Sequence, residues 1–438
     1  MTAPLTLRGL PGIGLGLRFR FDPLHLLSEA CRHGDLVALD FGAFGTFYAA
    51  FDPEDIRTVF RAGFRRHRAK LRALLGDGLF VVQSGDHWRK QRRLLQPAFH
   101  RDRLDELVAA ITARIAERYD RVWREYARTG EVFDLAGEMS RLSSEIILAT
   151  TFGPDLLDIA LPLADDLGEV VRFLDHQLFS PVSIPARLPT PANRRYRRAI
   201  ARFEEAVQRA REARRAPGGT GSDFLSSFIQ ARTTEGETMS PKELRDEVIS
   251  TFVAGTETMG MALTWCWRML AANPEAAEKA RAEAEQVLGD RAPTAAELAR
   301  MPYAQAIVQE TLRLYPPAWA MVRVLEEPRE IQGYSLPAGS AVMVSSFVTH
   351  RDPRFWDEPL AFRPERFLNG QPDKYAYFPF GQGQHQCIGN RLSVMESALS
   401  VIMGLQRFRI ELVRDYRKLL PHIALTPEPT PLVRISLR

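Results

Sequence analysis

The sequence predicts a mainly α-helical fold with small β-sheets. Three observations support this prediction. Helix signals dominate from Arg101 to Tyr315, alternating apolar and polar residues typical of strands appear after residue 320, and 45% of the 438 residues are hydrophobic. That composition is ample for a large core. There is no internal repeat, and the one linker-like stretch, residues 216–222, reads as a helix connection rather than a domain boundary.

The strongest single element is a long central helix. Ser240-Pro241-Lys242-Glu243 forms a capping box with proline at the first helical position, and the next strong stop is Asn273-Pro274. A helix of roughly thirty residues is about 45 Å long. Residues 249–270 in its middle are almost uncharged. A helix that is apolar on all sides is expected to run through the centre of a large domain.

The other elements follow from similar signals. A helix is expected over residues 192–215, and Asp223 caps the next one. Thr294 and Glu297 form a second capping box, and the helical run that follows ends at Tyr315. Alternating patterns predict short strands and hairpins at residues 322–324, 331–347 with a break at 337–339, and 432–437.

Charge and cysteine content exclude several classes of protein. The formal charge is +4, from 58 basic and 54 acidic residues, so no nucleic-acid partner is required. Three cysteines without paired spacing argue against a disulfide framework and fit a reducing compartment. The apolar run at residues 9–17 is too short to span a bilayer and lacks the marks of a secretory signal. A cytoplasmic protein without a transmembrane anchor is therefore expected.

Residues 378–389, FPFGQGQHQCIG, place Cys387 in a polar, glycine-dense turn. A nucleotide loop would need a third glycine or a Gly-Lys-Ser/Thr ending, and a zinc site would need further Cys or His ligands. A catalytic thiol would need a base, and His385 stands at a poor spacing. A structural cysteine and an iron ligand remain. Glycines that let backbone amides approach the sulfur, and a helix start just after it, favour a stabilised thiolate of the kind an axial iron ligand requires.

The pattern Phe380-Gly381-x-Gly383-x-His385-x-Cys387-x-Gly389 resembles the heme-binding signature of the cytochromes P450. The resemblance implies that Cys387 is the metal ligand. The family most often has Arg where His385 stands. A histidine can also donate to a heme propionate, but its charge depends on pH.

Other marks of the family recur in the expected order. Glu310-x-x-Arg313 resembles the ExxR motif, and Pro364-Glu365-Arg366-Phe367 resembles the PERF motif. The resemblance implies that Arg366 joins Glu310 and Arg313 in a buried structural network under the heme-binding loop. Trp88 and Arg92 match the WxxxR motif and share a helical face. The cofactor-binding residues implied in total are Trp88, Arg92, Ala254, Arg323, Phe380, His385, Cys387 and Gly389.

The central helix carries Ala254-Gly255-Thr256-Glu257-Thr258. Gly255 weakens the helix, and the Thr258 hydroxyl can bond the Ala254 carbonyl four residues back, which opens a polar notch in an apolar rod. The segment resembles the oxygen-activating segment of the family. The resemblance implies that Glu257 and Thr258 are catalytic and handle protons.

The resemblance covers nearly the whole chain. It implies a single triangular cytochrome P450 domain at residues 22–438 after an N-terminal extension at 1–21, with heme b between the central helix and the Cys387 loop. The implied reaction is monooxygenation with O2 of a hydrophobic small molecule: a terpenoid, carotenoid, fatty acid or steroid. The segments expected to face this substrate are rich in apolar side chains with few charges: residues 74–82, 173–182, 253–254, 318–321 and 426–428. Electrons would come from a separate ferredoxin or flavodoxin-type donor, and a monomer is expected. The alternatives are a hydrogen-peroxide-dependent peroxygenase and a non-catalytic heme sensor or electron carrier.

Overall fold

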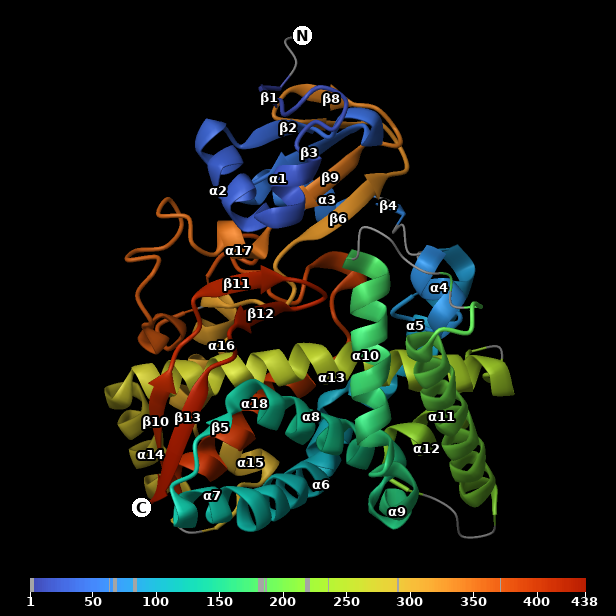
Figure 1. Cartoon of the computed structure of the whole chain (residues 1–438). Coiled ribbons are helices and arrows are strands. Elements are labelled where there is room, and N and C mark those ends of the chain that lie inside the picture. Colours follow the sequence, from blue (N-terminus) through green and yellow to red (C-terminus); the bar gives the residue numbers. More distant parts are fainter. Residues whose placement is uncertain are drawn as a thin grey trace. The chain divides into compact units, whose positions relative to one another are not determined.

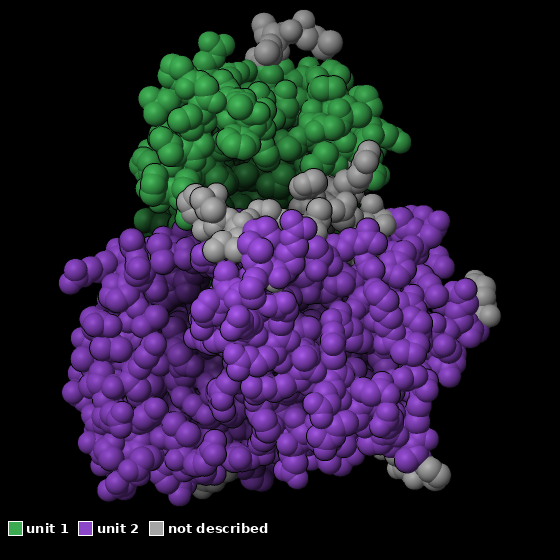
Figure 2. Space-filling view, turned by 45° about the vertical axis from the view of Figure 1, so that its right-hand side comes forward, with its two compact units in different colours: residues 1–67, 309–390 green, residues 68–308, 391–438 purple. Residues whose placement is uncertain are grey.

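The computed structural model describes residues 4–62, 64–65, 69–81, 85–179, 185, 187–216, 221–234, 236–289, 291–370 and 372–438. Residues 64, 65, 69, 70 and 179 are described by their backbone alone. The chain divides into two compact units, distinguished by colour in Figure 2. Unit 1 holds residues 1–67 and 309–390, and unit 2 holds residues 68–308 and 391–438. The expectation of one domain from residue 22 onward stays a prediction.

Unit 1 is built on a six-stranded sheet with the strand order β1-β2-β3-β9-β6-β4. Pairing is antiparallel between β2 and β3, β6 and β9, and β4 and β6, whereas β1–β2 and β3–β9 are parallel. The strands are β1 (Thr6–Leu7), β2 (Leu36–Asp40), β3 (Thr46–Ala50), β4 (Phe64–Arg65), β6 (Met321–Leu325) and β9 (Ala341–Val344), and a separate hairpin joins β7 (Arg329–Ile331) to β8 (Tyr334–Leu336).

Short helices flank this sheet. The core of unit 1 gathers apolar residues of the sheet, of α3 and of the segment before Cys387, among them Ile56, Phe60, Val342, Val344 and Phe378. Since Phe60 and Phe378 also meet edge to face at 5.6 Å, this core supports the start of the Cys387 loop. The helices are α1 (Gly16–Phe21), α2 (Pro23–His33), α3 (Pro53–Arg61) and α17 (Ser346–Thr349), with single 3₁₀ turns at η1 (Gly42–Phe44), η5 (Pro364–Phe367) and η6 (Gly383–His385).

Unit 2 is mainly helical (Figure 1). Its strands form a three-stranded sheet of order β10-β13-β5 and a β11–β12 hairpin. The strands are β5 (Phe133–Asp134), β10 (Phe408–Arg414), β11 (Lys418–Pro421), β12 (Leu425–Glu428) and β13 (Leu432–Leu437). The helices are α4 (Ala69–Leu75), α5 (Gly85–Leu95), η2 (Gln96–Phe99), α6 (Arg101–Arg118), η3 (Tyr119–Trp123), α7 (Arg124–Thr129), α8 (Leu135–Phe152), η4 (Pro154–Leu156), α9 (Leu157–Ala160), α10 (Leu163–Phe179), α11 (Pro191–Arg215), α12 (Phe224–Gln230), α13 (Pro241–Ala272), α14 (Pro274–Leu288) and α15 (Ala295–Leu298). Two further helices, α16 (Pro302–Leu314) and α18 (Asn390–Leu405), cross the boundaries between the units.

The long helix α13 is largely buried within unit 2. Its capping box at Ser240 and its end at Asn273 are as predicted, and both Trp265 and Trp267 are fully buried. Helix α18 packs closely against α13, since a Cβ at Gly404 of α18 would lie 2.4 Å from the Trp267 ring. Helix α8 lies along α13 (Figure 1), and the Ser143 hydroxyl donates to the Thr256 carbonyl at 3.1 Å. The buried central helix expected from its apolar middle is therefore confirmed.

Most element predictions are confirmed, with two exceptions. The helices at 191–215 and 302–314, the Asp223 cap and the strand at 432–437 are as expected. The predicted strand pattern up to residue 347 is wrong at its end, because β9 stops at Val344 and Phe347 lies in α17. The short strands of the first 65 residues were not predicted. Within the described part of the chain, no helix is both long and apolar enough to cross a bilayer.

Candidate functional site

The loop that carries Cys387 is held by its own backbone. The N–H of Cys387 donates to the Phe380 carbonyl at 2.9 Å, and the N–H of Gly381 donates to Phe378 at 3.0 Å. Gly383 has φ +75°, and a Cβ there would lie 2.8 Å from the Phe60 carbonyl oxygen, so only glycine fits. Cys387 itself is exposed, and α18 begins three residues later at Asn390. A rigid turn thus presents the thiol outward in front of a helix N-terminus.

These hydrogen bonds refine the expected amide cradle. The N–H groups of Gly381, Gln386 and Cys387 are used inside the turn, on the carbonyls of Phe378, Gly383 and Phe380. They hold the loop's shape and are not aimed at the sulfur. Stabilisation of a thiolate would therefore come from amides that follow Cys387 and from the start of α18.

Two basic side chains in unit 1, Arg323 and His385, are buried, and both have N–H groups that can donate hydrogen bonds to an anion. Arg323 on β6 is 4% exposed and lies over the Phe60 ring at 5.4 Å, and His385 in η6 is 8% exposed. Phe380 and Gly389 are half-buried on the same loop. Guanidinium and imidazole N–H groups can donate hydrogen bonds to carboxylates, and the propionates of a heme are carboxylates. The residues present therefore fit the group that the sequence motif implies.

Glu310, Arg313 and Arg366 form the network that the motifs predicted. Glu310 and Arg313 are both 0% exposed and make a bidentate pair at 2.7 and 2.8 Å. The Arg366 Nε–H donates to Glu310 at 3.1 Å, and the Arg363 N–H donates to the same oxygen at 2.8 Å. The remaining Arg313 donors reach three backbone carbonyls, those of His350, Pro359 and Ala361. Since every charge has partners, this cluster fixes three chain segments together.

His350 links this network to the Cys387 loop, and sequence reasoning missed it. Its carbonyl accepts from Arg313 at 2.8 Å, while its Nε2 accepts the Phe378 N–H at 2.9 Å. The ring is fully buried, and this burial, aided by the charges of Arg313 and Arg351, holds the pKa of His350 well below its usual value. A neutral ring is what an acceptor Nε2 requires. The only sequence signal was its position before Arg351-Asp352-Pro353.

The predicted acid–alcohol segment lies in the unbroken middle of α13. The Thr258 hydroxyl donates to the Ala254 carbonyl at 2.7 Å, as expected. Glu257 and Ala254 are half-buried. Burial raises the pKa of Glu257, the nearby Asp175 carboxylate raises it further, and His422 partly opposes them. A raised pKa lets this carboxyl group keep its proton at higher pH than an exposed glutamate would.

Helix α5 carries the other two predicted heme contacts. Trp88 is 6% exposed, and Arg92 one turn later is half-buried with its Nε–H 3.2 Å from the Gln96 side-chain oxygen. The outer face of the helix is basic. Arg89 pairs with Asp86 at 2.6 Å and Lys90 with Glu237 at 3.3 Å.

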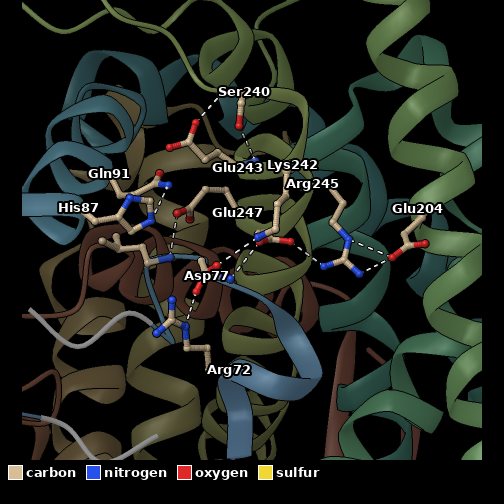
Figure 3. Close-up of polar contacts among 12 residues, drawn as sticks. Arg72, Asp77, His87, Gln91, Glu204, Ser240, Lys242, Glu243, Arg245 and Glu247 are labelled. Carbon is tan, nitrogen blue, oxygen red and sulfur yellow. Dashed lines mark hydrogen bonds and ion pairs between the residues drawn. The ribbon is translucent and has the colours of Figure 1, made fainter. Parts of the chain in front are cut away.

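A polar clasp that was not predicted holds residues 76–81 against the first turns of α13 (Figure 3). Three side chains of α13 accept backbone N–H groups of this segment. Asp246 accepts from Asp77 at 2.9 Å, Glu247 from Leu79 at 2.8 Å, and Ser250 from Phe80 at 3.2 Å. The fit is close, since a Cβ at Gly78 would lie 2.5 Å from the Asp246 carbonyl oxygen.

The two carboxylates of the clasp differ in charge compensation. Lys242 and Arg245, both labelled in Figure 3, pair with Asp246 at 2.7 and 2.6 Å. Glu247 accepts a backbone N–H but is flanked by acids, and burial raises its pKa to about 8. The clasp thus holds Asp77, Leu79 and Phe80 within residues 74–82, a segment expected to face substrate. Val82 and residues 180–182 of another such segment lie outside the described residues.

Comparison with known proteins identifies the family. The family model "Cytochrome P450" matches residues 4–433. The chain is similar to cyclooctatin synthase of Streptomyces melanosporofaciens, with 36% identity over 92% of this chain and 89% of the relative. It is also similar to cyclooctat-9-en-7-ol 5-monooxygenase of the same organism, with 33% identity over 89% and 85%. Pentalenene oxygenase of Streptomyces avermitilis is 30% identical over 93% and 91%.

These matches span nearly the whole chain and include relatives named as oxygenases. They agree with the mainly helical architecture and with the chemistry of the residues gathered around Cys387 and along α13. The chain therefore belongs to the cytochrome P450 family: it is a monooxygenase that carries heme b and acts on a hydrophobic substrate with O2 and electrons from a redox partner.

Proposed function

We propose that Cys387 is the thiolate ligand of the heme iron and that the enzyme oxygenates a terpenoid. The observation that carries the ligand assignment is the exposed thiol of Cys387 on a turn that three internal backbone hydrogen bonds hold in shape. When bound, heme b supplies the iron at which O2 is activated, and a thiolate ligand favours cleavage of the O–O bond. The segment 22–438 works in this proposal as one catalytic domain, with residues 1–21 as an extension.

The same proposal assigns residues that hold the heme. Basic and indole donors suit the propionates, and small or flat side chains suit the ring faces. The donors to propionates are Arg92, Arg323, His385 and Trp88. Ala254, Phe380 and Gly389 contact the macrocycle.

Glu257 and Thr258 handle the protons that O2 reduction consumes. Thr258 donates its own hydroxyl proton to Ala254 at 2.7 Å, which leaves its oxygen lone pairs as acceptors. Glu257 has a raised pKa because it is buried, so it can carry a proton into apolar surroundings and release it. An acid next to an alcohol on one helix is thus a route for delivering protons one at a time.

The substrate class rests on similarity. The three relatives are named for cyclooctatin, cyclooctat-9-en-7-ol and pentalenene, which favours a terpenoid among the four classes expected. Segments expected to face substrate are apolar, including Leu74, Phe173 and Val253, which suits a large hydrocarbon skeleton.

The electron donor is a ferredoxin or flavodoxin-type protein in this proposal, and the enzyme is a cytoplasmic monomer. The docking surface is a basic set at the α5 and α6 helices: Arg89, Lys90, Arg93, Arg101 and Arg103. Several of these are paired with acids on their own helix, such as Arg103 with Glu106 at 2.8 Å. The pairing lowers the net charge of the surface, so the attraction of an acidic donor should be moderate and weaken with salt.

Two measurements test the proposal. The reduced carbon-monoxide difference spectrum of the Cys387→Ser variant should lose the thiolate-type band, whereas Cys31→Ser should keep it. A retained band in Cys387→Ser would refute the ligand assignment. A panel of terpenoids, carotenoids, fatty acids and steroids, scored by the change in heme absorption on binding and by oxygenated product, tests the substrate class. Turnover confined to a class other than terpenoids would refute that part alone.

A further inference from the structure

Helix α8 packs closely against the stretch of α13 that carries the proposed proton carriers. A Cβ at Gly255 would lie 3.2 Å from the Ile147 side chain, and a Cβ at Gly260 would lie 3.0 Å from the Ser140 Cα. Both distances are shorter than ordinary carbon–carbon contacts of about 3.5–4.0 Å. Glycine at these two positions therefore lets the α13 backbone approach α8 without a side chain between them.

Between these two contacts, a buried hydroxyl group of α8 reaches the backbone of α13. The Ser143 hydroxyl donates to the Thr256 carbonyl at 3.1 Å, and the two residues are 1% and 2% exposed. The Thr256 carbonyl belongs to the peptide unit whose nitrogen is that of Glu257. The hydrogen bond therefore acts directly on the peptide unit from which the Glu257 side chain projects.

A second hydroxyl group bonds a carbonyl of the same turn. The Thr258 hydroxyl donates to the Ala254 carbonyl at 2.7 Å. In an α-helix, each carbonyl also accepts the N–H four residues later. A carbonyl that accepts a further donor from a side chain tends to tilt away from the helix axis, which favours local bending. The direction in which Glu257 and Thr258 point thus depends on Ser143 as well as on Thr258 itself.

We propose that Ser143 is a positioning residue for proton handling by Glu257 and Thr258. Its hydroxyl group holds the Thr256–Glu257 peptide in the orientation from which these two side chains act. No proton passes through Ser143. A general acid must lie about 2.6–3.2 Å from the atom that it serves, so a small rotation of this peptide would impair proton delivery. This inference rests on the proton-handling role proposed above for Glu257 and Thr258.

The test compares three variants of the heme-loaded enzyme with its donor system and an accepted substrate. Ser143→Ala removes the bond to α13, and Thr258→Ala is the reference for impaired proton delivery. Ser144→Ala is the matched control, because Ser144 is 4% exposed and donates to the Ser140 carbonyl of its own helix at 2.8 Å. Since both serine variants lose one hydrogen-bonded hydroxyl of α8, their urea midpoints should fall by similar amounts.

The first readout is coupling, the fraction of consumed electrons found in product. Ser143→Ala should lower coupling several-fold, toward the Thr258→Ala value, while Ser144→Ala should behave like the parent. Parent-like coupling in Ser143→Ala, with Thr258→Ala uncoupled, would overturn this inference and leave the proton role of Thr258 intact. If Thr258→Ala itself stays coupled, the proposed proton role fails, and the inference fails with it.

The second readout does not depend on turnover. The infrared stretching band of carbon monoxide bound to the reduced heme responds to polar groups beside the bound gas, which the proposed function expects Thr258 to be. Ser143→Ala should shift this band in the same direction as Thr258→Ala, and Ser144→Ala should leave it in place. A loss of stability alone would move neither serine variant's band. A parent-like band in Ser143→Ala, or equal shifts in the two serine variants, would contradict the inference.

Discussion

Glu310 in unit 1 and Glu247 in unit 2 are both buried carboxyl groups that accept a backbone N–H at 2.8 Å, yet their surroundings differ. Glu310 also receives two arginines, Arg313 and Arg366. Glu247 has acidic neighbours, Asp246 and Glu243, that raise its pKa, and burial raises it more strongly. Equal burial is therefore combined with different charge compensation: two arginines pair with Glu310, whereas burial and acidic neighbours raise the pKa of Glu247.

The comparison separates two ways of holding a loop. The Glu310 cluster is an ionic lock. Arg313 alone donates five hydrogen bonds in it, two to the Glu310 carboxylate and three to the carbonyls of His350, Pro359 and Ala361. In contrast, Glu247 accepts a single hydrogen bond, from the Leu79 N–H, and burial raises the pKa of its carboxyl group to about 8. The first should fail only when a partner is removed, and the second should respond to pH.

Breaking the ionic lock should have the largest effect. Arg313→Ala leaves Glu310 charged and buried and frees three carbonyls, which should cost about 3–5 kcal/mol of unfolding free energy. The expected result is loss of most heme-loaded protein, measured as heme content per chain after expression and as the urea midpoint. Arg366→Ala is the milder companion, since Arg313 still neutralises Glu310. Equal heme content in Arg313→Ala and the parent would show that the lock is dispensable.

The second-largest effect is expected from a variant that removes the titratable carboxyl group of Glu247. Its pKa is raised to about 8 in the folded protein from an ordinary value of 4.5, so the folded state binds the proton more tightly and stability falls as pH rises between these values. Glu247→Gln keeps the neutral acceptor for Leu79 and should remove a slope of at most about 1.4 kcal/mol per pH unit. Urea unfolding from pH 5 to 8 measures it. A variant whose stability follows the parent at every pH would mean that Glu247 stays ionised.

The third bond of the clasp should matter less and without pH dependence. Ser250→Ala leaves the Phe80 N–H without its acceptor and should cost about 1 kcal/mol. Hydrogen exchange should quicken at Phe80 and stay unchanged at Arg363, whose N–H bonds Glu310. Faster exchange at both positions would show that the two regions are not independent.

The smallest loss of stability is expected from breaking an exposed ion pair. Arg128 and Glu125 are exposed on α7 and joined at 2.6 Å. Water screens their attraction, so Arg128→Ala should leave the urea midpoint of the parent unchanged within error. A shift comparable to that of Ser250→Ala would contradict the view that burial gives the other contacts their weight.

The sequence by itself determined the family and the chemistry. Short motifs located Cys387, the Glu310–Arg313–Arg366 cluster and the Thr258 bond to Ala254, because each depends on residue type at a local spacing. Capping residues at Ser240 and Asn273 placed the ends of α13, since helix ends are decided by neighbouring residues. The first four strands escaped prediction because they are short and are stabilised by partners distant in sequence, as β3 is by β9.

Only the tertiary structure decided which side chains meet. His350 became the link to the Cys387 loop because it lies between Arg313 and Phe378, and no spacing in the sequence announces that position. Likewise, Asp175 and His422 are 247 positions apart and meet only because the β11–β12 turn reaches α10. Periodicity tells which face of an element is buried, but the neighbour on that face, and hence the charge of a buried group, follows from packing.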